Sequence, residues 1–168
     1  MTETLSPTLP EDVERLAQRV ARRASRRGVK LVTAESCTAG LLASLITDVE
    51  GCAHVFDRGF VTYSDAAKRQ MLGVPQALLN ACGAVSAAAA RAMAEGALAA
   101  SDGDLALAVT GFAGTGEPGD EPGLVHFAVA RRDGQTRALE KHFGDIGRGP
   151  VRIGCLRTGL EMLQRAIG

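Results

Sequence analysis

The chain has 168 residues, of which 46% are hydrophobic and 23% are charged, as is usual for one soluble α/β domain with a real core. Lysine and arginine together number 19, and so do aspartate and glutamate, so the formal net charge is zero. This balance argues against nucleic-acid and membrane-surface partners, which usually need a basic field.

The cysteines indicate neither a metal site nor a redox site. Cys37, Cys52, Cys82 and Cys155 lie far apart and form no C-x-x-C pair. The sequence shows no apolar segment of a secretory signal and no apolar run long enough to span a bilayer. We therefore expect a cytoplasmic protein whose cysteines are reduced and mostly packed in the interior.

The first third of the chain predicts an arm, a helix, a strand and a second helix. Residues 1–9 are polar and contain proline, which favours a flexible arm in front of one domain over 10–168. Apolar residues recur at three- and four-residue steps over 11–27, which is the pattern of an amphipathic helix. Gly28 ends this helix, a strand is predicted over 29–34, and a helix over 38–48.

The middle of the chain alternates in the same way. The run VFDRGFVT predicts a strand over 55–62. A short helix over 65–72 is stopped by Gly73 and Pro75, and Pro75 opens another short helix to residue 81. Ser86 is then placed to cap a long alanine-rich helix that runs to residue 100.

The last third predicts the centre of the sheet and a closing helix. The apolar run over 105–110 is typical of a strand buried on both faces, and a glycine-rich loop follows over 111–123. Two strands, 124–131 and 136–142, join at the hairpin sequence Asp133-Gly134, and a helix covers 150–167. These elements predict the α/β class: a single three-layer α/β/α domain with a mixed, mostly parallel central sheet covered by helices on both faces.

The stretch AESCTAG places Ser36 where a buried strand turns into a helix. A serine there is exposed at the carboxyl end of the sheet, and the unpaired N–H groups of the following helix could stabilise an oxyanion or bind a phosphate. The alternative is that Ser36 or Thr38 merely caps the helix.

Three further stretches could contribute to a site. Tyr63, the only tyrosine, and Lys68, one of three lysines, follow the second strand, and a desolvated lysine can act as a base toward a serine hydroxyl. The glycines after Thr110 could form an anion-binding nest, although about half of such loops are only turns. Arg148 and Arg152 at the last helix could hold a phosphate or could be ordinary solvated charges. No histidine or carboxylate cluster has metal spacing, so we predict no metal and no cofactor.

Four stretches together carry a family resemblance: TAESCTAGLLASLITDVEG, FDRGFVTYSDAAKRQMLGVP, GAVSAAAARAMAEGAL and DLALAVTGFAGTG. Because these stretches occur in this order and at this spacing, the chain resembles the carboxy-terminal domain of the CinA competence/damage-inducible protein family. The resemblance covers about residues 11–167. The stand-alone form of that domain is a nicotinamide-nucleotide amidase, also called NMN deamidase. The resemblance therefore implies hydrolysis of nicotinamide mononucleotide (NMN) to nicotinate mononucleotide and ammonia.

The resemblance also implies roles for individual residues. Ser36 would attack the carboxamide carbon, and Lys68, helped by Tyr63, would take and return the proton. Substrate contacts would come from the serine turn, the glycine-rich loop and the last helix: Cys37, Thr38, Gly40, Thr110, Gly111, Ala113, Gly114, Gly116, Arg148 and Arg152. A homo-oligomer is expected.

Two alternatives stay open at this point. The glycine-rich loop departs from the usual family sequence, with Glu121 at a position where lysine is usual. The chain could therefore be a non-catalytic nucleotide-binding or regulatory module of the same fold, or an amidase that acts on another small amide.

Overall fold

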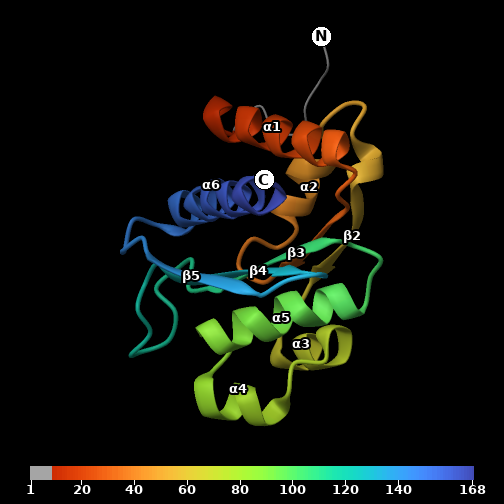
Figure 1. Ribbon diagram of the computed structural model, residues 1–168. Helices are drawn as coiled ribbons and strands as arrows, with labels where there is room; N and C mark the ends of the chain where they lie inside the picture. The colour runs from red at the N-terminus through yellow and green to blue at the C-terminus, as the bar shows by residue number, and fades with distance from the viewer. Residues whose placement is uncertain (1–8) are drawn as a thin grey trace.

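A computed structural model describes residues 9–168, and its centre is a five-stranded sheet in the order β2-β1-β3-β4-β5 (Figure 1). The strands are β1 Leu31–Glu35, β2 Phe56–Val61, β3 Leu105–Gly111, β4 Leu124–Arg131 and β5 Arg137–His142. β1 pairs in parallel with β2 and β3, whereas β3 with β4 and β4 with β5 pair antiparallel. Only β4 therefore runs against the other four strands, which confirms a mixed, mostly parallel sheet.

Helices cover both faces of the sheet (Figure 1). On one side lie α2 Leu41–Thr47 and α6 Arg148–Ile167, and α1 Glu11–Arg27 packs over both of them. On the other side lie α5 Ala87–Ala99, α3 Asp65–Leu72 and α4 Gln76–Cys82. A short 3₁₀ helix, Ala53–Val55, precedes β2. The three-layer α/β/α class is thus confirmed. α1 is an additional outer helix that packs on α2 and α6.

The two faces of the sheet differ in the size of their side chains, and this sets how closely the helices approach. Leu107, Val109 and Phe127 face α2 and α6, whereas Ala106, Ala108, Ala128 and Ala130 face α5. Small residues on both the strands and α5 allow close packing there. At Gly96 of α5, an added Cβ would lie 1.9 Å from the main-chain oxygen of Leu72, so only glycine fits.

The element boundaries differ from the sequence predictions by two or three residues at β1, which begins at Leu31 instead of residue 29, and at two helix starts. α2 begins at Leu41 instead of residue 38, because Ala39 and Gly40 have positive φ angles of 49° and 92° and cannot continue a helix. α6 begins at Arg148 instead of residue 150, because a proline is tolerated within the first turn of a helix. The predicted arm falls almost entirely on residues 1–8, outside the described residues. Over 9–168, no helix is both long and apolar enough to cross a bilayer.

Candidate active site

Ser36 stands directly after β1, at the carboxyl edge of the three parallel strands. Its main-chain N–H donates to the Val109 oxygen of β3 at 3.0 Å, and the Thr62 N–H after β2 donates to the Glu35 oxygen at 2.8 Å. The ends of three neighbouring strands are therefore tied together around Ser36, whose surface is only 8% exposed. This edge is where open α/β sheets bind their ligands.

The Lys68 amine lies beside the Ser36 hydroxyl, with 3.2 Å between Nζ and Oγ. Nζ also donates to the main-chain oxygens of Thr62 at 2.9 Å and Tyr63 at 3.3 Å. Lys68 is only 1% exposed, and burial lowers the pKa of its ammonium against the opposing charge of Asp65. As an ammonium, Nζ can donate to Ser36 Oγ and to both carbonyls. Once it has lost a proton, the amine keeps two N–H donors for the two carbonyls and gains a lone pair that can accept the serine proton.

Glu35 is a buried site residue that the sequence analysis missed. Its carboxylate, 0% exposed, accepts hydrogen bonds from Thr38 Oγ1 at 2.6 Å and from the main-chain N–H groups of Gly40, Leu42 and Ala43 at 2.9–3.1 Å. Glu35, and not Ser36 or Thr38, therefore caps α2. An acidic residue directly after the apolar run 31–34 was the available clue, because buried carboxylates need several donors.

The cap also corrects the prediction that the start of α2 offers free N–H groups to a substrate. The N–H groups of Gly40, Leu42 and Ala43 donate hydrogen bonds to the Glu35 carboxylate instead. Within residues 9–168, the N–H groups of Cys37 and Thr38 have no oxygen acceptor. An oxyanion formed at Ser36 would therefore depend on these two donors.

A pocket of about 170 Å³ opens beside Ser36 and Lys68. The residues that line it come from the ends of β1, β2 and β3, from α3, from the loop before α5 and from the start of α6: Ser36, Cys37, Tyr63, Lys68, Ala84, Val85, Thr110, Gly111, Phe112, Ala113 and Arg148. Eight of the predicted site residues thus meet in one place. The Thr110 hydroxyl donates to the Ala84 oxygen at 2.8 Å and joins β3 to the loop before α5.

Arg148 and Tyr63 form the rim of this pocket. Arg148 Nη2 donates to the Tyr63 hydroxyl at 3.4 Å, and Tyr63 is 64% exposed. Tyr63 meets Lys68 through its main-chain oxygen, not through its phenol. The predicted help from Tyr63 to Lys68 is therefore a carbonyl contact, and the phenol lies with the guanidinium.

The other predicted residues support the site from outside the pocket. Thr38 and Gly40 hold the Glu35 cap. Arg152 donates to the Thr38 oxygen at 3.1 Å, so it braces the serine turn. Gly116 turns tightly over Asp120, and Gly114 lies near Arg148 without lining the pocket. Gly111, which does line the pocket, is also needed for packing, because an added Cβ would lie 2.6 Å from Val125 Cγ2.

The buried thiols and the histidines contribute no metal site. Cys37 contacts Cys155 of α6, and the hydrogen bond from the Cys155 thiol lowers the pKa of Cys37, while the same contact and burial raise that of Cys155. His142 contacts Glu121 and Glu140 at the surface. In the described part of the chain, no three His, Cys, Asp or Glu side chains are placed to hold a metal ion.

Comparison with known proteins assigns this architecture. The model of the CinA C-terminal domain matches residues 13–167. A crystal structure of a competence/damage-inducible protein from Agrobacterium tumefaciens is 46% identical, with a TM-score of 0.90 over 95% of this chain and 97% of that one. One from Klebsiella pneumoniae is 39% identical, with a TM-score of 0.86 over 91% and 95% of the two chains.

Longer relatives share the same region. A protein of Symbiobacterium thermophilum described as competence-damage inducible is 54% identical over 74% of this chain and 30% of its own length. A CinA-like protein of Geobacter sulfurreducens is 47% identical over 88% of this chain and 36% of its own. The chain thus spans about a third of the length of these curated relatives. It belongs to the CinA C-terminal domain family.

Proposed function

We propose that this protein is an amidase that hydrolyses the carboxamide of NMN, with Ser36 as the nucleophile. The observation that carries the proposal is the 3.2 Å contact between the Ser36 hydroxyl and the buried Lys68 amine. A serine paired with a base of lowered pKa is the arrangement that nucleophilic catalysis requires. The family resemblance supplies the choice of NMN.

The contacts support a two-step route. Neutral Lys68 takes the Ser36 proton while Oγ attacks the carboxamide carbon, and the charge on the carboxamide oxygen is stabilised by the N–H groups of Cys37 and Thr38. The Lys68 ammonium then returns its proton to the departing nitrogen, which leaves as ammonia. Lys68 next takes a proton from a water molecule that attacks the acyl ester, and it returns this proton to Ser36 Oγ as the ester bond breaks and nicotinate mononucleotide leaves.

The rim is suited to the phosphate of the nucleotide. Arg148 lies at the pocket mouth, and its contact with the Tyr63 hydroxyl leaves other N–H groups of the guanidinium for a phosphate. The N–H groups of residues 113–116 also have no acceptor within the described chain. Gly114 of this loop lies near the Arg148 guanidinium, which favours a phosphate held by both the cation and the main-chain donors.

Ammonia release from NMN, nicotinamide and NAD tests the proposal. NMN is expected to be the preferred substrate, and Arg148→Gln should raise KM for NMN about tenfold while hardly affecting slow turnover of nicotinamide. Binding of NMN with no ammonia would identify a non-catalytic nucleotide-binding module. Faster release from an amide without a phosphate would identify another amidase.

A further inference from the structure

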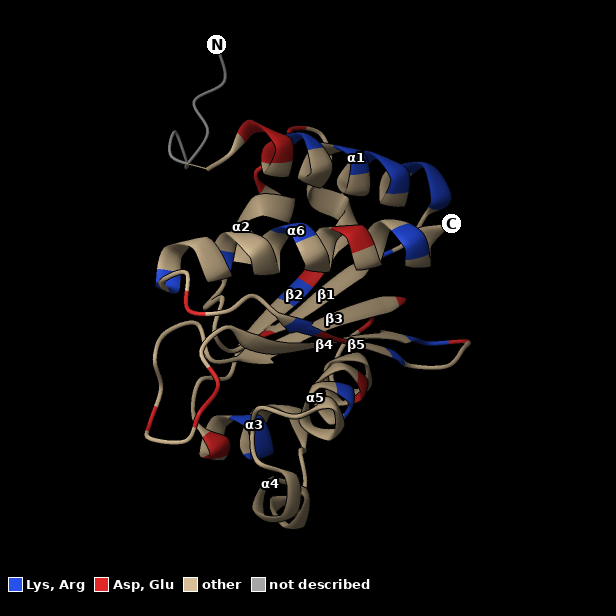
Figure 2. Cartoon of the chain, turned by 90° about the vertical axis from the view of Figure 1, so that its left-hand side faces the viewer, with Lys and Arg blue, Asp and Glu red and all other residues tan. Residues whose placement is uncertain are grey.

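The C-terminal three-quarters of α1, residues 15–27, carry a concentration of positive charge that the zero net charge of the whole chain does not reveal. Residues 15–27 contain six arginines and no acidic residue: Arg15, Arg19, Arg22, Arg23, Arg26 and Arg27. The whole chain has 19 basic and 19 acidic residues, so the remainder has 13 against 19 and a formal charge of −6. Figure 2 shows this part of α1 as largely blue on the outer surface of the molecule.

Most of these arginine side chains form no ion pair or hydrogen bond within residues 9–168. Arg15 pairs with Glu11, and Arg23 donates to the main-chain oxygen of Gly168. Arg19, Arg22 and Arg26 are exposed and form no ion pair with any residue in 9–168. Favourable interaction with the helix dipole reaches only the last turn, so it accounts for Arg26 but not for Arg19 or Arg22.

The arginines also share a hollowed surface. Arg15, Arg19, Arg22, Arg23 and Arg26 line a shallow depression of about 400 Å³ together with Gln18 of the same helix and Gln164 of α6. No acidic residue is among the lining residues. This depression and the Ser36 pocket share no lining residue, so the two are separate surfaces.

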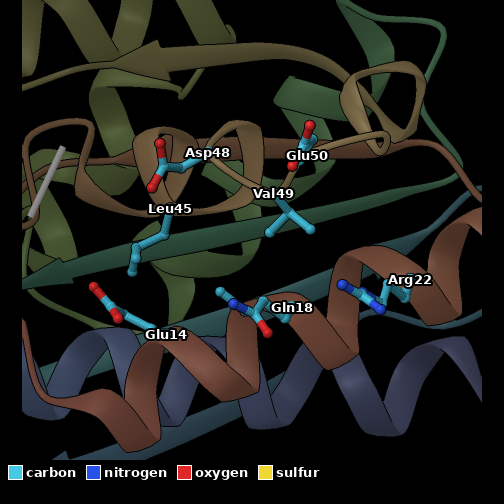
Figure 3. Close-up of a pocket in the computed structure, with 8 residues that line it drawn as sticks. Glu14, Gln18, Arg22, Leu45, Asp48, Val49 and Glu50 are labelled. Atoms are coloured by element: carbon cyan, nitrogen blue, oxygen red, sulfur yellow. The ribbon is translucent and has the colours of Figure 1, made fainter. Parts of the chain in front are cut away.

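A second pocket marks where this basic surface ends. Glu14, Gln18 and Arg22 of α1 face Asp48 and Glu50 at the end of α2, around a space of about 250 Å³ (Figure 3). The carboxylates make that side unfavourable for an anion. A long anion would therefore lie along the α6 side of α1.

We propose that this arginine surface binds the phosphate backbone of duplex nucleic acid without reading its sequence. Arg15, Arg19, Arg22 and Arg26 recur at steps of four and three residues and span about 16 Å, over which one strand of a duplex presents about five phosphates. All six basic residues are arginine, whose planar guanidinium group can donate two parallel hydrogen bonds to phosphate oxygens. Gln18 and Gln164 add uncharged hydrogen-bond donors. The proposal departs from our expectation from the net charge, because the field at one surface does not depend on the average charge of the chain.

A lipid surface suits the site less well. A helix that lies in a membrane interface presents an apolar face beside its basic one, whereas Val13, Leu16, Val20 and Ala24 of α1 are buried in the core. The exposed face of α1 therefore has no apolar side chains that could insert into a bilayer. Repeated phosphates on a linear polymer match the row of guanidinium groups.

Fluorescence anisotropy with a labelled 20-base-pair DNA, from 50 to 200 mM salt, tests the inference. Arg19→Gln/Arg22→Gln/Arg26→Gln should raise Kd at least tenfold at 50 mM salt and reduce the slope of log K against log salt by about 2–3. The matched variant Arg69→Gln/Arg91→Gln/Arg137→Gln, which removes three exposed charges elsewhere, should stay within about twofold of the parent chain. Unchanged melting temperature and ammonia release would show that the α1 variant is folded.

Three results would overturn the inference. One is equal loss of binding in the two triple variants, which would mean that only total charge matters. Another is binding of polyglutamate as tight as that of DNA, which would indicate an acidic protein partner. The third is binding to phosphatidylserine vesicles in the absence of any DNA binding.

Discussion

At Lys68, burial lowers the pKa of the ammonium on which the proposed chemistry depends, against the opposing charge of Asp65. Because burial lowers the pKa of the ammonium, kcat/KM should rise with pH up to that lowered pKa and then level. The unfolded chain keeps a lysine of pKa about 10.4 and so binds more protons between the two values. The Lys68 contribution to stability therefore increases with pH across that window.

Lys68→Arg should abolish turnover almost as fully as Lys68→Ala, by about 10²–10⁴-fold, since arginine does not release its proton. Affinity for NMN should change much less. Arg69→Lys, a charge-conserving change at the exposed neighbour, is the control and should stay active. An active Lys68→Arg variant with the parent pH profile would mean that Lys68 is only an electrostatic contact.

Glu35→Gln should lower the free energy of unfolding by about 1–3 kcal/mol, because an amide cannot accept all four hydrogen bonds of the α2 cap. Turnover should fall as well, since the same bonds fix the turn that bears Ser36. Urea denaturation measures the first effect. Glu95→Gln, on an exposed part of α5, is the control, and an equal response of both variants would contradict the cap.

For single residues, the sequence predicted which residues form the site better than it predicted the role of each one. Ser36 and Lys68 stand in sequence motifs, Arg148 stands at the start of the last predicted helix, and the fold brings the three together. Glu35 was missed because its role depends on a bend of the chain after β1, and no spacing rule covers an acceptor that lies outside the helix it caps. Their catalytic roles remain predictions.

Among the elements, the close approach of α3 and α5 makes a sharp prediction. Gly96→Ala should lower the free energy of unfolding by about 3 kcal/mol, since its Cβ would overlap the Leu72 carbonyl and force the helices apart. Gly149→Ala in α6, where an added Cβ meets nothing within 4 Å, should be neutral or slightly stabilising. Thermal or urea unfolding of both variants measures the difference; equal effects would refute the packing argument.

The turn before α2 holds strain that can be relieved. Ala39 has φ 49°, a conformation that is unfavourable for alanine, so Ala39→Gly should raise the free energy of unfolding by about 0.5–1 kcal/mol. Gly40→Ala, at φ 92°, should lower it. A destabilised Ala39→Gly variant would contradict this account of the turn.

Helices and strands were largely predictable because local patterns determine them. The α5 cap at Ser86 is confirmed, as is the β4–β5 hairpin. The start of α2 was not predictable to the residue, because the positive φ angles of Ala39 and Gly40 keep residues 38–40 out of the helix. The position of α1 over α6 and α2 depends on tertiary packing that no periodicity reveals.

For the whole molecule, assembly stays a prediction. Val61 and Tyr63 near the site and Ile146 before α6 are exposed large hydrophobic or aromatic residues, and such residues often lie at interfaces. We expect a homo-oligomer, which light scattering of the purified chain can measure. A monomer at micromolar concentration would contradict the expectation.

The most direct measurement for the whole account is ammonia release from NMN by the Ser36→Ala variant, with NMN binding measured by calorimetry on the same sample. Because the alanine removes only the hydroxyl beside Lys68, we predict that turnover falls by at least about 10³-fold while Kd stays within a few-fold of the parent value. Turnover within tenfold of the parent chain would show that Ser36 is not the nucleophile.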